Sequence, residues 1–122
     1  MTDFGIPSDT ITEITNILNR YPEIYCAKIF GSRAMGNYKR YSDIDIAIFA
    51  PESQYLCAHV KDEIDDLYVI YTFDIVHYQM ITNEALKSHI QRVGKTIHGL
   101  GENTDEPGSS AITKTNVAEG LT

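Results

Sequence analysis

The sequence predicts a small α/β (α+β) domain in which a β-sheet is backed by helices. Segments with hydrophobic residues at helical spacing alternate along the chain with short runs rich in β-branched and aromatic residues. The chain has 122 residues and is 43% hydrophobic, which is enough for one core and too little for two. We therefore expect one domain over residues 1–98. A disordered or loosely attached tail is expected over 99–122, where aromatic residues are absent.

The first helix and strand follow from spacing and from helix-breaking residues. A helix is expected over residues 8–19, because hydrophobic residues recur on one face: Ile11, Ile14 and Leu18. Thr10 and Glu13 have the spacing of a capping box, and Pro22 prevents the helix from continuing. A strand is expected next, over residues 24–30.

The second half of the domain repeats this alternation. A strand is expected over 44–49 and a helix over 53–67, with one hydrophobic face: Leu56, Val60, Ile64 and Leu67. The run 68–77 is rich in β-branched and aromatic residues and predicts a third strand. Asn83 is expected to cap a last helix that Gly94 ends, with its own hydrophobic face: Leu86, Ile90 and Val93.

Two aspartates lie at the start of the strand expected over 44–49. Because side chains alternate between the faces of a strand, Asp43 and Asp45 are expected to lie side by side, opposite the buried isoleucines. Two carboxylates at that separation repel each other, so the arrangement favours a bound cation. Carboxylate oxygens suit Mg²⁺, which typically keeps positions free for water and phosphate.

Further polar residues predict a phosphate-binding site beside these aspartates. Gly31 and Ser32 lie where a strand gives way to a turn or short helix, and backbone N–H groups in such a turn can hold phosphate oxygens. Arg33 is placed either to contact phosphate or to brace the acidic cluster. Asp74 lies in an otherwise apolar strand, where a carboxylate is costly unless it is paired or binds metal.

This pattern resembles a known signature. Gly31-Ser32, then ten residues, then Asp43-Ile44-Asp45, with Asp74 later, is similar to the DNA polymerase β-like nucleotidyltransferase superfamily. The short length of the chain, with "GSRAMGNYKRYSDIDIAI" near the front, resembles the minimal nucleotidyltransferase (MNT) branch of this superfamily, which includes MntA-like antitoxins of HEPN/MNT toxin–antitoxin systems.

The resemblance implies a mixed sheet, ATP as substrate and transfer of AMP with release of pyrophosphate. It implies that Asp43, Asp45 and Asp74 are catalytic and bind two Mg²⁺ ions, and that Gly31, Ser32 and Arg33 bind the nucleotide. It further implies a HEPN-type ribonuclease toxin as partner, adenylylated on a tyrosine hydroxyl. Met35 departs from the pattern, since many relatives carry a basic residue in this loop.

Composition bears on the alternatives. The net charge of −7 disfavours a nucleic-acid substrate, because phosphate backbones are bound through basic surfaces. With no signal peptide or apolar span in the sequence, we expect a cytoplasmic protein. Two alternatives remain open: an antitoxin that neutralises its partner by binding alone, and an adenylyltransferase acting on a small molecule such as an aminoglycoside. The latter is disfavoured because 98 residues leave no evident second domain to form its pocket.

Overall fold

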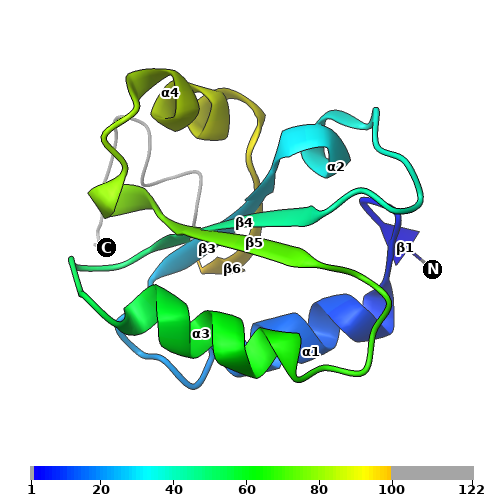
Figure 1. Ribbon diagram of the computed structural model, residues 1–122, viewed down its shortest axis with the longest axis horizontal. Coiled ribbons are helices and arrows are strands. Elements are labelled where there is room, and N and C mark those ends of the chain that lie inside the picture. The colour runs from blue at the N-terminus through cyan, green and yellow to red at the C-terminus, as the bar shows by residue number, and fades with distance from the viewer. Residues whose placement is uncertain (1, 100–122) are drawn as a thin grey trace, which may run out of the picture.

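The protein is a mixed α/β domain, seen in a computed structural model that describes residues 2–99 (Figure 1). In chain order the elements are β1 (Thr2–Asp3), β2 (Ile6–Pro7), α1 (Ser8–Leu18), β3 (Cys26–Phe30), α2 (Gly31–Met35), β4 (Ile44–Phe49), α3 (Leu56–Asp65), β5 (Phe73–His77), the 3₁₀ helix η1 (Tyr78–Met80), α4 (Glu84–Val93) and β6 (Lys95–Gly99).

The central sheet has four strands in the order β5-β4-β3-β6. Strand β3 pairs antiparallel with both β4 and β6, whereas β4 and β5 run parallel. Parallel strands require a crossover connection, and α3 provides it between β4 and β5. Since β4 and β5 are parallel, both begin at the same end of the sheet. Strand β3 ends there too, and α2 follows it directly.

Helices cover both faces of the sheet (Figure 1). On one face, α1 and α3 pack against the isoleucines of β4, and the main core consists of these and other buried residues: Ile6, Ile14, Ile17, Leu18, Ile24, Ala27, Ile29, Ile44, Ile46, Ile48, Ala50, Leu56, Val60, Ile64 and Phe73. On the other face, α4 covers a smaller core of Phe30, Ala47 and Ile90. Strand β4 is therefore buried on both faces along most of its length.

The predicted fold class and most elements are confirmed. Strand β4 has the expected bounds, and α1 ends one residue before the predicted end. Asn83 is the N-cap of α4, where its side-chain oxygen accepts a hydrogen bond from the Leu86 N–H at 3.1 Å. Helix α4 ends before Gly94, as expected. Helix α3 is shorter than the predicted 53–67.

Two local predictions are wrong. The capping box does not form, because α1 begins at Ser8 with Pro7 as its N-cap, and Thr10 is buried within the helix. The predicted strand 68–77 begins only at Phe73, because β4 begins at Ile44, its register partner. The residues before Phe73 therefore have no neighbouring strand, and they form a loop despite their high β propensity.

Three strands, β1, β2 and β6, and the 3₁₀ helix η1 were not predicted. Strand β6 adds a short edge strand to β3, and its last residue, Gly99, pairs with Cys26. Strands β1 and β2 form a small hairpin, whose turn contains Phe4 and Gly5 with φ of 60° and 71°. The tail predicted for 99–122 lies, apart from Gly99, outside the described residues.

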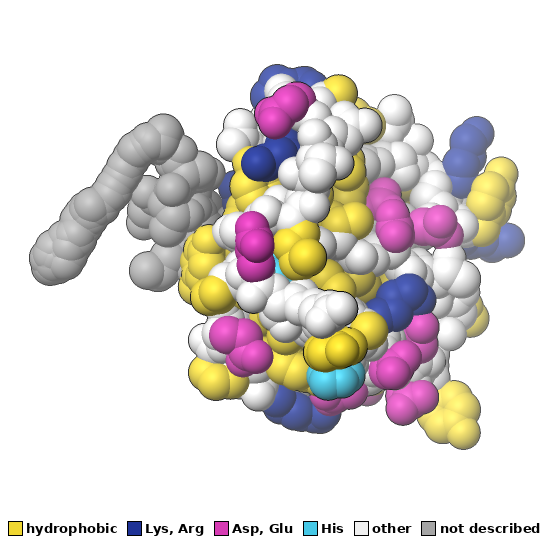
Figure 2. Space-filling model, turned by 60° about the vertical axis from the view of Figure 1, so that its left-hand side comes forward, with side chains coloured by type: hydrophobic (Ala, Val, Ile, Leu, Met, Phe, Trp, Pro, Cys, Tyr) yellow, Lys and Arg dark blue, Asp and Glu magenta, His cyan; other side chains and the backbone are white. Residues whose placement is uncertain are grey.

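The charges on the surface agree with the acidic composition of the sequence. Asp and Glu side chains are spread over the face seen in Figure 2, which carries no continuous basic stripe. In the part of the chain that the structure describes, no helix is both long and apolar enough to cross a membrane.

Candidate nucleotidyltransferase site

The three predicted aspartates lie at the end of the sheet where β4 and β5 begin. Asp45 and Asp74 are register partners on adjacent parallel strands, so their Cα atoms are about 4.8 Å apart across the sheet. Both lie on the face opposite the main core. Asp43 precedes β4 by one residue, and its Oδ1 accepts a hydrogen bond from the Thr72 hydroxyl. The structure thus brings the two segments that carry the carboxylates together.

The surroundings of Asp45 disfavour its charged form. Burial, together with the nearby Asp74 and Asp43 carboxylates, raises the pKa of Asp45 from 3.8 to about 6, and Arg33 opposes this rise. Asp45 is half-buried, while Asp43 and Asp74 are exposed. The domain therefore holds Asp45 where its negative charge is unfavourable unless a cation is near.

Gly31 lies in direct contact with Asp45. It begins α2 with φ of +73°, a backbone conformation that residues with a Cβ rarely adopt. A Cβ added at this position would collide with Oδ2 of Asp45. The glycine therefore lets the turn between β3 and α2 approach the carboxylate closely. Ser32, the next residue, is half-buried in the first turn of α2.

Arg33 is almost completely buried, with 2% of its surface exposed. Its Nη2 and Nε donate to the carbonyl oxygen of Ser42 at 2.9 and 3.1 Å, and Nη2 also donates to the Arg40 carbonyl at 3.2 Å. Its Nη1 donates to the carbonyl oxygen of Phe4 at 2.9 Å. Because Ser42 immediately precedes Asp43, this placement favours bracing of the acidic cluster over direct contact with phosphate.

Several supporting residues had no clear signal in the sequence. The rings of Tyr38 and Tyr71 lie 5.0 and 5.2 Å from the Arg33 guanidinium carbon, a distance at which cation–π attraction is favourable. A Cβ on Gly5 would collide with Tyr38, so the hairpin turn packs against the same loop. These contacts join residues from four separate segments, and no local pattern could have predicted them.

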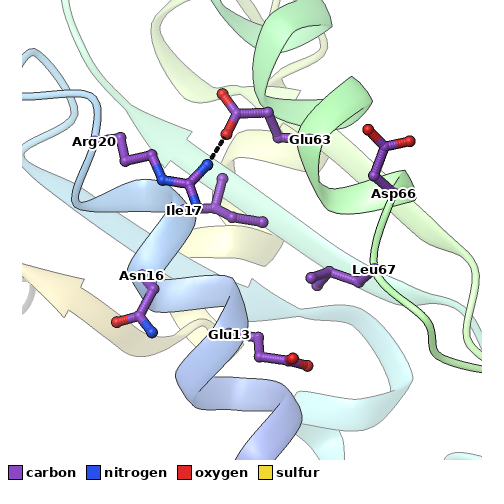
Figure 3. Close-up of a pocket in the computed structure, with 7 residues that line it drawn as sticks. All are labelled: Glu13, Asn16, Ile17, Arg20, Glu63, Asp66 and Leu67. Carbon is purple, nitrogen blue, oxygen red and sulfur yellow. Dashed lines mark hydrogen bonds and ion pairs between the residues drawn. The ribbon is translucent and has the colours of Figure 1, made fainter.

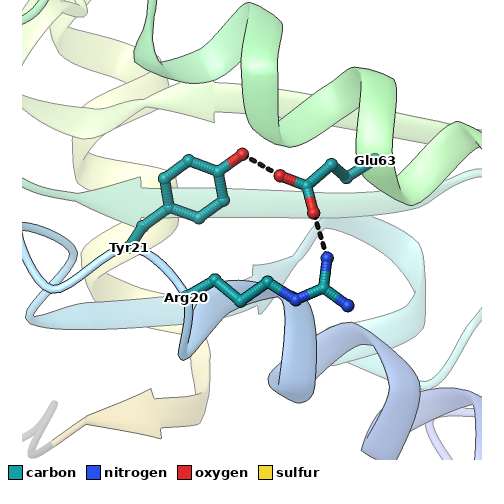
Figure 4. A network of polar contacts seen from close by, with 3 residues as sticks. All are labelled: Arg20, Tyr21 and Glu63. Atoms are coloured by element: carbon teal, nitrogen blue, oxygen red, sulfur yellow. Dashed lines mark hydrogen bonds and ion pairs between the residues drawn. The ribbon is translucent and has the colours of Figure 1, made fainter.

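A pocket of about 440 Å³ lies elsewhere, between α1 and α3 (Figure 3). It is lined by Glu13, Asn16, Ile17, Arg20, Glu63, Asp66 and Leu67. At its edge, both Arg20 and the Tyr21 hydroxyl donate to the Glu63 carboxylate (Figure 4). The hydrogen bond from the Tyr21 hydroxyl, together with burial, raises the pKa of Tyr21 to about 12. Because α1 and α3 cover the opposite face of the sheet, the pocket is separate from the aspartates.

The donor set at the aspartates fits Mg²⁺ held together with a phosphate ligand. Within residues 2–99, no three histidine, cysteine, aspartate or glutamate side chains are arranged to hold a metal ion by themselves. Mg²⁺, however, commonly takes one or two protein carboxylates and completes its shell with water and substrate phosphates. The raised pKa of Asp45, caused by burial and then by the Asp74 and Asp43 carboxylates, is the observation that fits a cation here, since a nearby cation would stabilise the charged carboxylate.

Residues 12–103 match the family described as "Polymerase beta, Nucleotidyltransferase". The chain belongs to this polymerase β nucleotidyltransferase family. The match begins within α1, after the β1–β2 hairpin. It covers the rest of α1, all the other helices and every strand of the central sheet. No curated protein matches the sequence.

Solved structures share this nucleotidyltransferase fold. A toxin–antitoxin complex with AMP-PNP matches with a TM-score of 0.64 and 22% identity over 75% of each chain. The toxin–antitoxin MntA–HepT matches with a TM-score of 0.59 and 18% identity, over 77% of this chain and 74% of the other. A complex of tri-AMPylated Shewanella oneidensis HEPN toxin with MNT antitoxin matches with a TM-score of 0.58 and 18% identity, over 76% and 72%.

Proposed function

We propose that this nucleotidyltransferase is an antitoxin that transfers AMP from ATP to a tyrosine hydroxyl of a HEPN-type ribonuclease toxin. The observation that carries the proposal is the register of Asp45 with Asp74, beside the close approach of Gly31 to Asp45. The family supports nucleotidyl transfer as the reaction class. The acceptor and partner are supported by structures of similar fold that contain an MNT antitoxin with its HEPN toxin, in one case tri-AMPylated.

The residues have distinct roles in this proposal. Gly31 and Ser32 hold the triphosphate through backbone N–H groups and the serine hydroxyl. Asp43 and Asp45 would hold Mg²⁺ against the phosphates, and Asp74 would share a second ion with the acceptor. When bound, these ions neutralise phosphate charge. Arg33 keeps the loop ahead of Asp43 in place, so Asp43 and Asp45 need not reorganise when the nucleotide binds.

The chemical step is an in-line displacement at the α-phosphorus. The tyrosine oxygen forms a bond to the α-phosphorus, the bond from that phosphorus to the α–β bridging oxygen breaks, and pyrophosphate leaves. Asp74, which is exposed at the start of β5, accepts the phenolic proton and passes it to water. Positioning and charge neutralisation account for the rate, since little covalent chemistry is asked of the protein.

The test is a labelling experiment with matched variants. The protein is incubated with Mg²⁺ and α-labelled ATP, alone and with the HEPN-type protein encoded by the adjacent gene. We expect label on a tyrosine of that protein, and loss of label with Asp43→Asn, Asp45→Asn or Asp74→Asn. Asp62→Asn, an exposed aspartate on α3, is the control and should label normally.

Other outcomes would contradict the proposal in distinct ways. If the Asp43→Asn/Asp45→Asn double variant still neutralises the toxin fully, the protein acts by binding alone. If label appears on an added aminoglycoside and not on protein, the acceptor is a small molecule. If EDTA leaves labelling of the partner unchanged, the proposed role of divalent ions is wrong.

A further inference from the structure

Exposed hydrophobic side chains gather at the end of the sheet that carries the aspartates. In the described part of the chain, seven large hydrophobic side chains are exposed: Tyr25, Met35, Tyr41, Tyr55, Tyr68, Ile70 and Met80. Four of these seven come from the end of α2 and from the two loops that precede β4 and β5. Tyr68, Ile70 and Tyr41 are the most exposed of all, at 106%, 85% and 82%.

These four residues belong to segments that are tied together beneath the surface. Arg33 donates hydrogen bonds to the carbonyl groups on either side of Tyr41, and its guanidinium lies against the ring of Tyr71, the neighbour of Ile70. The Ile44 N–H also donates to the Thr72 carbonyl at 2.9 Å. The two loops are therefore neighbours at one end of the sheet, as Figure 1 shows for the segments leading into β4 and β5.

We propose that Met35, Tyr41, Tyr68 and Ile70 form the surface on which the acceptor protein docks. This inference rests on the proposed function, because it assigns a binding surface to the protein that receives AMP. Tyr41, Tyr68 and Ile70 are exposed over most of their surface and Met35 over half of it, so these side chains contribute little to a core. Aromatic residues and methionine are enriched where proteins bind each other. We name these four residues the apolar rim.

The position of the apolar rim identifies its occupant. The loop containing Tyr41 leads directly into Asp43, and the loop containing Tyr68 and Ile70 leads into Asp74. A hydroxyl group that reaches Asp74 from a protein surface must bring that surface close to both loops. A protein acceptor is therefore placed against the rim whenever its hydroxyl lies in the site.

Charge distinguishes this occupant from a second copy of the chain. Lys39 and Arg40 form the one adjacent Lys–Arg pair in the sequence, and both residues are exposed and directly precede Tyr41. They fit a partner with acidic groups around an apolar patch. A symmetric dimer through the rim would instead bring two identical faces together, and with them the aspartate sites of both copies. The repulsion between those sites disfavours self-association here.

The test compares the rim with an exposed tyrosine elsewhere. The variants are Tyr68→Ala, Ile70→Ala and a triple variant that combines these two substitutions with Tyr41→Ala. Tyr55→Ala is the matched control, because Tyr55 is 62% exposed but lies before α3, beyond the far end of β4. Binding of the HEPN-type protein is measured by calorimetry without nucleotide, so that damage to ATP binding cannot alter the result.

We expect the triple variant to weaken binding of that protein by about tenfold or more, as loss of central interface side chains does, and Tyr55→Ala to change it less than twofold. Because these side chains are exposed, the melting temperature should not fall, and Tyr68→Ala alone suffices if the triple variant does not fold.

The proposal is overturned if the triple variant binds as wild type does, or if wild type does not bind the HEPN-type protein. It is also overturned if the rim variants abolish a wild-type dimer without affecting partner binding. The outcome is separable from the proposed function: partner binding that depends on the rim, with no AMP transfer by wild type, would sustain the docking surface and reject the transferase.

Discussion

Replacing Asp45 by asparagine should make the protein more stable while removing its activity. The domain raises the pKa of Asp45 from 3.8 to about 6, chiefly by burial and then by the neighbouring carboxylates. Because the folded protein binds this proton more tightly than the unfolded chain does, the charged form of Asp45 destabilises the fold. The penalty is absent below pH 3.8, grows as the pH rises, and is complete above about pH 6.

The size of the effect follows from the shift. A shift of about two units corresponds to roughly 3 kcal/mol, at about 1.4 kcal/mol per unit. Asp45 is only half-buried, so solvent screening reduces this to about 1–1.5 kcal/mol. For a domain of this size, that gain corresponds to a rise in melting temperature of about 5–10 °C at pH 7.5. Near pH 4 most of the gain should be lost, because the wild-type carboxyl is largely protonated in the folded protein and about half protonated in the unfolded chain.

Differential scanning fluorimetry of wild type, Asp45→Asn and the surface control Asp62→Asn, at pH 4 and pH 7.5 without divalent ions, checks this prediction. Mg²⁺ with ATP should then raise the melting temperature of the wild type and not of Asp45→Asn. The reasoning is refuted if Asp45→Asn lowers the melting temperature at pH 7.5, or if its effect is equal at both pH values.

Three further predictions test other parts of the structure. Gly31→Ala should destabilise the fold by about 1–2 kcal/mol, because the backbone there is left-handed, and should lower AMP transfer at least tenfold, because the new Cβ displaces Asp45. Gly36 is also left-handed but has open space for a Cβ, so Gly36→Ala should lower stability alone. Thermal melts measure the stability of each variant, and labelling measures its AMP transfer. Asn83→Ala should destabilise the domain by about 1 kcal/mol in urea, and equal stability would contradict its capping role. Arg33→Lys keeps the positive charge, but a lysine cannot reach the carbonyl oxygens of Phe4, Arg40 and Ser42 together. We therefore expect a lower kcat at a nearly unchanged KM for ATP. A selective rise in that KM would instead indicate direct contact with phosphate.

Much of the fold was predictable because local signals agreed with the tertiary structure. The alternation of isoleucines and aspartates in β4 gave both its bounds and its two faces, and Asn83 marked the start of α4. The prediction failed where pairing partners decide the outcome. The segment before Phe73 has strand-like composition but lies beyond the end of β4, and the five residues of β6 form a strand because β3 offers a free edge.

The candidate site divides in the same way. The spacing of Gly31, Asp43 and Asp45 indicated a site, because each position needs a particular residue type. The contacts of Arg33 could not be predicted from the sequence, because the carbonyl of Phe4 and the rings of Tyr38 and Tyr71 come from segments up to 38 residues away. Burial of that guanidinium favours support of the loop over contact with the substrate, the two roles that the sequence left open for Arg33.

The hairpin turn at Phe4 and Gly5 has a practical consequence for how the protein is prepared. The family match starts at residue 12, so trimming the gene to the recognised domain would discard the turn. Arg33 would then lose its bond to the Phe4 carbonyl, and Tyr38 the glycine it rests on. Such a shortened protein would keep the strands of the central sheet but also lose Ile6 from the main core and the start of α1, so we expect it to be less stable and less active.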